Sequence, residues 1–148
     1  MPKRRIVKVS EVMGFSPAQS QGAYISRLLI EEEGVGSTRL NLVHATLKPG
    51  KAPGDFAAHP APYDEAYYIL RGRGLMEFGA GEEAYEVGPD TAIFIPGGTP
   101  HKITNIGAQD LEFLTIWPIA PAEEGINGVH DERKRAWGTT FRTIEPQR

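Results

Sequence analysis

The sequence predicts a single all-β domain, a barrel of the jelly-roll kind, on the basis of its turn formers and its apolar runs. The chain of 148 residues holds 17 glycines and 12 prolines. These residues separate short apolar runs at the spacing expected of an all-β barrel or sandwich. With 40% hydrophobic and 9% aromatic residues, the chain has enough apolar material for one core of its own.

Eight of these runs are rich enough in branched and aromatic residues to be strands. We predict strands over residues 23–30, 39–47, 66–70, 75–78, 84–87, 91–95, 102–105 and 111–117. Glycine-containing segments join several of them as tight loops, at residues 34–37, 72–74 and 79–81. Eight strands in one domain are typical of a jelly roll, which we expect to occupy residues 23–118.

The two ends of the chain are predicted to lie outside this barrel. Residues 1–22 indicate an N-terminal arm followed by a loop. Residues 119–148 form a C-terminal tail that includes Trp137 and Phe141, and apolar side chains in so long a tail are expected to pack on the barrel. The charged residues 131–135 in this tail are compatible with one or two helical turns.

Composition excludes several classes of function. The net charge of -3 argues against nucleic acid as a main partner, because phosphate binding needs a clustered cationic face. No cysteine is present, so any metal must be held by nitrogen and oxygen. No apolar stretch approaches the ~18 residues that cross a bilayer, and no signal peptide is evident, so we expect no membrane partner and a cytoplasmic location.

Three residues with good metal-ligating groups stand in turn-rich segments. His59 and Glu65 flank a proline-rich stretch just before the predicted strand 66–70. If that stretch is extended, both side chains have the same parity and point to one side. His101 ends a Pro-Gly-Gly-Thr-Pro turn and begins the next strand. The three residues therefore suggest one metal pocket.

The segments around these residues resemble the two paired motifs of the cupin superfamily, whose members are small double-stranded β-helix (jelly-roll) barrels that hold a metal inside. The first motif runs from Pro-Gly through His-x-His to Glu and a later Gly, and the second runs through Pro-x-Gly to His and Asn. Residues that match the motifs are His59, Glu65, Gly72, Pro96, Gly98, His101 and Asn105.

Two positions depart from this pattern. Ala61 occupies the place of the second histidine of the first motif, so one of the family's four usual ligands is missing. Asp90 stands where the second motif normally opens with Gly. Because Asp tolerates the left-handed turn conformation better than most residues, only the change at Ala61 is expected to affect chemistry.

The resemblance implies that His59, Glu65 and His101 hold a divalent transition metal, which the sequence leaves open among Fe, Mn, Ni and Zn. Two imidazoles and a carboxylate resemble the facial triad of non-heme iron enzymes, which leaves coordination positions open for oxygen and substrate. No organic cofactor is predicted.

The catalytic residues stay open, with Tyr63, Tyr67 and His44 as candidates. His44 equally fits a structural residue, as does His130 in the tail. Tyr24, Tyr67 and Phe94 are candidate walls of the interior, and Arg39, Arg71 and Lys102 are candidate partners for a substrate carboxylate or phosphate.

The resulting hypothesis is a metal-dependent enzyme acting on a small polar or carbonyl compound, of the oxygenase, isomerase, decarboxylase or lyase type. The alternatives are a non-catalytic cupin that binds a small, sugar-like molecule, which Ala61 favours, and a metal-free epimerase. The resemblance also implies a homodimer, because in many cupins the N-terminal arm adds to a partner's sheet.

Overall fold

The protein consists of β-strands joined by short turns. The structure, a computed structural model, describes residues 4–17, 20, 22–58, 63–119 and 141–146. Its strands are β1 (Gly14–Pro17), β2 (Tyr24–Ile30), β3 (Leu40–Leu47), β4 (Glu65–Arg71), β5 (Gly74–Phe78), β6 (Glu83–Val87), β7 (Thr91–Ile95), β8 (His101–Asn105), β9 (Leu111–Pro118) and β10 (Phe141–Ile144). The short helices are η1 (Val9–Glu11), α1 (Glu32–Val35) and η3 (Gly79–Gly81).

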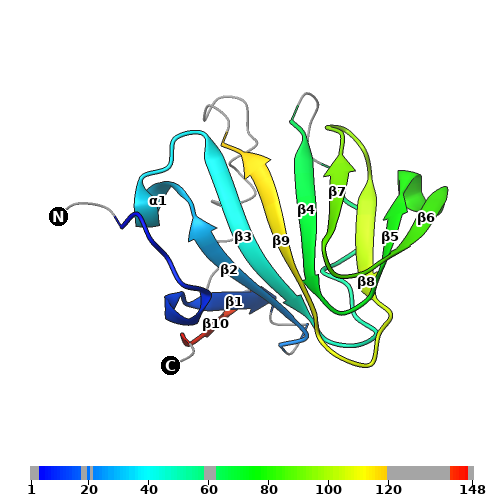
Figure 1. Cartoon of the computed structure of the whole chain (residues 1–148), viewed down its shortest axis with the longest axis horizontal. Coiled ribbons are helices and arrows are strands. Elements are labelled where there is room, and N and C mark those ends of the chain that lie inside the picture. The colour runs from blue at the N-terminus through cyan, green and yellow to red at the C-terminus, as the bar shows by residue number, and fades with distance from the viewer. Residues whose placement is uncertain (1–3, 18–19, 21, 59–62, 120–140, 147–148) are drawn as a thin grey trace.

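The strands form two antiparallel sheets, which confirms the predicted all-β jelly-roll class. The larger sheet has the order β10-β1-β2-β3-β9-β4-β7, and the smaller one has the order β6-β5-β8. Figure 1 shows β3, β9 and β4 running side by side through the middle of the molecule, with β8, β5 and β6 at one side. Strands that follow one another in the chain can therefore lie in different sheets, as β7 and β8 do, and strands far apart in the chain can pair, as β3 and β9 do.

All eight predicted strands are present, with bounds that differ from the prediction by at most one residue at either end. Alternation of buried side chains with more accessible ones explains this agreement, and it is complete in β9, where buried and half-buried residues alternate. Two further strands lie outside the predicted set. β1 belongs to the expected arm, and it pairs within the same chain with β2 and β10.

Two turns depend on a left-handed backbone. Asp90 has φ 60°, and its N–H donates to the Ile69 carbonyl at 2.9 Å, so an aspartate does here what glycine does in the family motif. Gly72 has φ 89°, and a Cβ on it would lie 2.6 Å from the Asp110 carbonyl oxygen. Gly72 is therefore required both by conformation and by the close approach of the loop before β9.

The apolar core extends from the end of the barrel where β4 finishes to Ile95, which pairs with Glu65. It is built from inward-facing residues of both sheets, and its largest fully buried members are Phe113, Leu47, Ile69, Met76, Ile95, Ile103 and Leu111. Asn105, also fully buried, lies at this end. Its Nδ2 donates to the carbonyls of Leu47 at 2.9 Å and Gln109 at 2.8 Å, and its Oδ1 accepts from Gly107 N at 2.9 Å. This motif residue therefore joins β8 to β3 and to the loop before β9.

Candidate metal centre

Glu65 and His101, two of the three predicted ligands, meet inside the barrel although 36 positions separate them in the chain. Glu65 begins β4 in the larger sheet, and His101 begins β8 in the smaller one. The Glu65 Oε1 and His101 Nε2 atoms are 3.1 Å apart, and both side chains are more than nine-tenths buried. The two sheets thus place a carboxylate and an imidazole face to face, away from bulk water.

The turn before β8 is fastened to the residue before Glu65. Asp64 Oδ1 accepts a hydrogen bond from Gly97 N at 2.9 Å, and Thr99 N donates to the Pro96 carbonyl at 3.1 Å. In the same turn Gly98 has φ 80°, a conformation that suits glycine. These contacts explain why the sequence needs this turn: it holds the start of β8 against the start of β4.

A hydrogen bond at Nδ1 fixes the orientation of the His101 ring. His101 Nδ1 lies 3.0 Å from the Thr99 carbonyl oxygen, which can only accept, so Nδ1 carries the hydrogen and donates it. In the neutral ring, Nε2 then presents its lone pair to Glu65 Oε1. Two lone pairs at 3.1 Å repel unless a proton or a cation lies between them. The same backbone anchoring fixes the ring of metal-binding histidines in many proteins.

The electrostatics of the pair favour a positive charge between the two side chains. Burial by itself lowers the pKa of His101, but the hydrogen bonds that its ring donates to Glu65 and to the Thr99 carbonyl, together with the negative charge of Glu65, outweigh burial and raise the pKa. A proton therefore binds more firmly to His101 than to an ordinary histidine. Any metal at this place must compete with that proton.

The third predicted ligand, His59, lies outside the described residues, as does Ala61. Among the residues that the structure does describe, no group of three or more His, Cys, Asp or Glu side chains is placed to hold a metal ion. Glu65 and His101 supply one oxygen and one nitrogen donor, which suits a divalent transition metal.

Aromatic residues wall the pair. The buried Tyr67 ring meets the His101 ring edge to face, with 5.9 Å between centroids and an interplanar angle of 78°, and packs on Phe113 at 5.1 Å. Tyr24 is also buried in the core, as predicted for a wall residue. Tyr63 is half-buried just before β4. Of the three catalytic candidates, Tyr67 is the one that touches the His101 ring.

The inward-facing side chains change from polar to apolar along the barrel. At the end where β4 begins, inward positions hold Glu65 together with Asn41 and Thr115, both buried, and Asn41 pairs with Trp117 across β3 and β9. Towards the other end the same strands present Leu47, Ile69 and other core residues. We did not single out Asn41 or Thr115 from the sequence, although the alternation within residues 40–47 and 111–118 would have placed them inside.

Comparison with known proteins agrees with this geometry. A family model described as a cupin domain matches residues 43–117, which is half of the chain. The chain belongs to the cupin family. The matched range contains Glu65 and His101 and ends at Trp117, so it includes both described donors of the site.

Curated relatives resemble this cupin over part of their length. An uncharacterized protein of Methanocaldococcus jannaschii is 51% identical over 51 residues, 34% of this chain and 39% of that protein. The glucose-6-phosphate isomerase of Thermococcus kodakarensis is 34% identical over 89 residues, 53% of this chain and 47% of that protein. This cupin therefore spans less than half the length of these relatives.

A solved structure extends the likeness over most of the chain. The polyketide cyclase RemF from Streptomyces resistomycificus superposes with a TM-score of 0.65 at 24% identity, and the alignment covers 88% of this cupin and 94% of that chain. At this identity the likeness concerns the fold. The cupin fold thus includes strands beyond the range of the family match.

Other residues expected near the site lie elsewhere in this cupin. Phe94 alternates with the inward Ile93 and Ile95 and is 63% exposed, so the expectation that it walls the interior is wrong.

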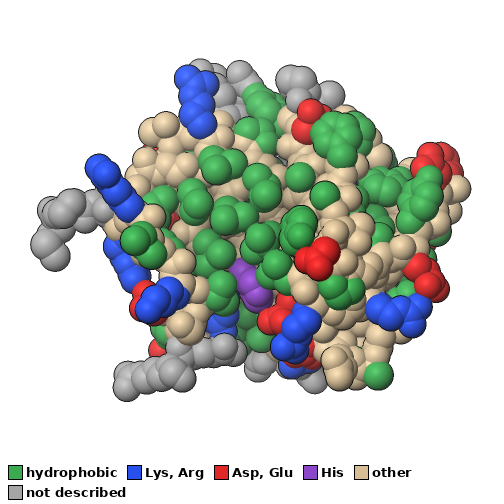
Figure 2. Space-filling view, viewed as in Figure 1, with side chains coloured by type: hydrophobic (Ala, Val, Ile, Leu, Met, Phe, Trp, Pro, Cys, Tyr) green, Lys and Arg blue, Asp and Glu red, His purple; other side chains and the backbone are tan. Residues whose placement is uncertain are grey.

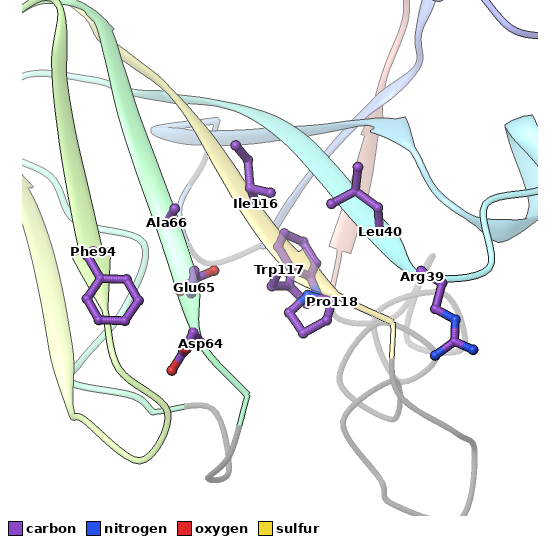
Figure 3. Close-up of a pocket in the computed structure, with 9 residues that line it drawn as sticks. All are labelled: Arg39, Leu40, Asp64, Glu65, Ala66, Phe94, Ile116, Trp117 and Pro118. Carbon is purple, nitrogen blue, oxygen red and sulfur yellow. The ribbon is translucent and has the colours of Figure 1, made fainter.

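The cations suggested as substrate partners have other neighbours in the structure. Arg71 pairs with Glu112 at 3.0 Å, and the Lys102 ammonium lies 5.2 Å from the centre of the Phe56 ring. Arg39, by contrast, lines a hollow that Glu65 and Trp117 also line (Figure 3). His130 lies outside the described residues. Within the part of the chain that the structure describes, no helix is long and apolar enough to span a membrane.

His44 lies on the opposite face of β3 from the site. It pairs across strands with Leu114 and Arg27, whereas the neighbouring Ala45 belongs to the core. Its Nε2 is 3.8 Å from Glu112 Oε1, and its buried Nδ1 has no hydrogen-bond partner among the residues that the structure describes. Burial lowers the pKa of His44 and the Arg27 charge adds to this, while Glu112 opposes it.

This placement predicts how acid affects the stability of this cupin. The unfolded chain takes up a proton at His44 near an ordinary pKa of about 6.5 more readily than the folded chain does. The contribution of His44 to the free energy of unfolding should therefore fall as pH drops below that value, opposite in sign to the contribution of His101, and His44→Leu should remove it. Urea denaturation from pH 7.5 to 5.5 measures it. Equal slopes for both proteins would contradict the role of His44.

Proposed function

We propose that this cupin is a metal-dependent enzyme acting on a small polar or carbonyl compound, with the metal held by His59, Glu65 and His101. The observation that carries the proposal is the buried Glu65–His101 pair at 3.1 Å, with His101 Nδ1 anchored on the Thr99 carbonyl. That arrangement presents a carboxylate and an imidazole lone pair to one point, as a cation requires.

A divalent transition metal at this point would supply Lewis acidity to a substrate oxygen. The chain's own residues would do the rest. Asn41 and Thr115 offer hydrogen bonds to polar substrate groups at the end of the barrel where β4 begins, while Tyr67 and Trp117 wall it against water. A compact substrate with two or three oxygens fits this mixture of apolar wall and few polar groups.

Among the possible reaction classes we favour isomerisation of a hydroxy-carbonyl compound. Support comes from the glucose-6-phosphate isomerases of Thermococcus kodakarensis and Thermococcus gammatolerans, which share 53% of this chain at 34% and 32% identity. The remaining length of those enzymes has no counterpart in the match. The oxygenase, decarboxylase and lyase types remain the comparison classes for an activity screen.

A second candidate is a metal-free cupin that binds a small sugar-like molecule. The same pair favours it, because a proton between Glu65 and His101 also satisfies both side chains, and the raised pKa of His101 holds that proton. Ala61 in place of a fourth ligand supports the same reading. On this reading the pair is a hydrogen-bonding group, and metal should not improve ligand binding.

Metal analysis separates the two candidates. Untagged protein purified without chelators should carry near-stoichiometric Fe, Mn, Ni or Zn, measured by elemental mass spectrometry, and His59→Ala should lose it. Calorimetric titration in buffers of different ionisation enthalpy should show that metal binding releases a proton. The affinity for metal should become weaker as the pH is lowered, because His101 must lose its proton before it can bind the ion. Protein that takes up none of these ions after incubation would favour the metal-free binder.

The substitution Ala61→His tests the missing fourth ligand. If position 61 faces the ion, the added imidazole should tighten metal binding about 10-fold or more, since each further neutral ligand makes the ion harder to remove. Competition with a chelator measures the change. An affinity equal to that of the parent protein would show that position 61 points elsewhere.

A further inference from the structure

Two polar side chains inside the barrel have no hydrogen-bond partner in the part of the chain that the structure describes. Asn41 on β3 is 4% exposed, and Thr115 on β9 is 7% exposed. Neither the Asn41 amide nor the Thr115 hydroxyl makes a hydrogen bond there, whereas the buried amide of Asn105 makes three. Buried amides and hydroxyls are nearly always hydrogen-bonded, because removing them from water otherwise costs free energy. The two groups are therefore candidates for binding a ligand.

The polarity of these two positions is not a requirement of the sheet. Along β3 and β9 their neighbours that face outward are apolar, namely Leu40, Leu42, Leu114 and Ile116. Figure 2 shows hydrophobic side chains gathered across the middle of this side of the molecule. A sheet that covers a core usually has the reverse pattern, with apolar residues inside and polar ones outside. Unpaired polar residues at inward positions make folding less favourable, so they point to a function.

Strand pairing sets the distance of Asn41 and Thr115 from Glu65. Asn41 pairs with Trp117 across β3 and β9, and the register of β9 with β4 brings Trp117 opposite Glu65. Thr115 lies one inward position further along β9, opposite Tyr67. Neighbouring strands are ~4.8 Å apart, so the backbones at Asn41 and Glu65 are roughly 10 Å apart. A ligand held at both ends must therefore reach across two strand spacings.

This spacing limits the length of the ligand between Asn41 and Glu65. A hydrogen bond at each end takes up about 3 Å, which leaves roughly 4 to 5 Å between the two ligand atoms. Atoms three bonds apart in an extended chain are about 3.8 Å apart, so two oxygens joined through about three carbons are separated by about 5 Å. A hydroxyl and a carbonyl oxygen in a compact molecule meet this requirement.

The two unpaired groups are uncharged, and each can both donate and accept. An amide offers N–H donors and a carbonyl acceptor, and a hydroxyl group offers both in one atom. A carboxylate or phosphate only accepts, and it needs a cation to balance its charge. Of the cations suggested for that role, Arg71 pairs with Glu112, and Lys102 lies near the Phe56 ring. The neutral groups therefore favour a hydroxyl over an anion at this end of the ligand.

The surface between Asn41 and Glu65 is aromatic and can be reached from solvent. Trp117, which is buried, lies between them in the register of the sheet. Aromatic rings give the carbon chain of a ligand an apolar surface, while neighbouring polar groups bind its oxygens. Glu65 and Trp117 also line a hollow of about 270 Å³ at the start of β4, together with Arg39 (Figure 3). This hollow gives a small molecule a path to the row.

We propose that Asn41 and Thr115 select an uncharged hydroxy-carbonyl compound of about four carbons by hydrogen bonding its hydroxyl groups, while its carbonyl end lies at the Glu65–His101 pair. This inference rests on the proposed function in placing a polar compound at that pair. It holds for either occupant of the pair, because a metal ion and a proton on His101 would each attract a carbonyl oxygen. Asn41 and Thr115 are thus binding groups that decide specificity, and no bond is made or broken at them.

Calorimetric titration of the full chain with the four-carbon ketose erythrulose, and with its 4-phosphate, tests the proposal. Erythrulose should bind, and its phosphate should bind at least about 10-fold more weakly. Asn41→Leu and Thr115→Val keep the approximate size of the side chains but remove the polar groups, so each should weaken erythrulose binding about 10-fold. Both variants should keep or raise the thermal midpoint of unfolding, because each replaces an unpaired buried group by an apolar one. A purely structural role would lower that midpoint instead.

The matched control is Thr46→Val, which makes the same change on the outward side of β3 and should leave erythrulose binding unchanged. A phosphate that binds as tightly as erythrulose, and loses affinity in Arg39→Gln, would overturn the proposal and place an anion in the hollow. Absence of erythrulose binding, or parent-like affinity in Asn41→Leu or Thr115→Val, would also overturn it. Failure of the proposed function is distinct: protein that takes up no metal but needs Asn41 to bind erythrulose retains this specificity as a metal-free binder.

Discussion

Replacing His101 by alanine is expected to lower the affinity of the barrel for divalent metal by more than about 100-fold, since loss of an outer-shell partner alone costs about 10- to 100-fold. His101 is the imidazole whose Nε2 faces Glu65 Oε1 at 3.1 Å, and without it a single described donor is left. The fold should persist, because His101 lies at the polar end of the barrel interior and not in the apolar cluster. Titration calorimetry with Mn²⁺ and Zn²⁺ measures the loss.

Two further variants make the result specific. Glu65→Gln keeps the size of the side chain and one hydrogen-bonding oxygen but removes the charge, so it should also weaken metal binding strongly. Lys102→Ala changes the next residue of β8, whose side chain lies over the Phe56 ring outside the barrel, and should leave affinity unchanged. Full metal binding by His101→Ala would show that Glu65 and His101 do not form the centre.

The second large effect is expected for the buried amide of Asn105. Asn105→Ala removes three hydrogen bonds, to Leu47 and Gln109 carbonyls and from Gly107 N, in a place with no access to water. At about 1 kcal/mol for each bond, the free energy of unfolding should fall by about 3 kcal/mol. Urea denaturation measures this loss, and metal affinity corrected for the unfolded fraction should change little.

The aspartate variant tests the reason for that loss. Asn105→Asp has nearly the same shape, but its carboxylate cannot donate to the two carbonyls and should destabilise the fold at least as much as alanine. Thr104→Ala, at a half-buried outward position of the same strand, should stay within about 0.5 kcal/mol of the parent. Parent-like stability of Asn105→Asp would mean that packing volume, and not donation to the two carbonyls, accounts for the contribution of Asn105 to stability.

Local patterns in the sequence were sufficient for the strands of the barrel. Alternation of apolar and polar residues fixes a strand and its faces, which is why residues 111–117 were assigned correctly and found buried at every second position. The left-handed turn at Asp90 was also predictable, because the conformational preference belongs to the residue itself. The spacing of the motif residues was specific enough to indicate the family.

The same patterns failed where both sides of a strand are apolar. In Thr91–Ile95 neighbouring residues are equally hydrophobic, so the sequence does not tell which of Ile93, Phe94 and Ile95 point inward. Pairing with β4 decides it and places Phe94 outside. The strands β1 and β10 were missed because a four-residue strand is too short for a periodic signal and is stabilised by partners far away in the chain.

The sequence by itself determined the all-β class, the eight strands of the barrel and the donor types of the site, because these depend on residue identity and local spacing. Only the tertiary structure decided that Glu65 and His101 are neighbours, that His44 lies on the other side of the sheet, and that Phe94 points outward. The physical reason is that these relations arise from pairing between strands distant in sequence, where register, and not composition, sets which side chains meet.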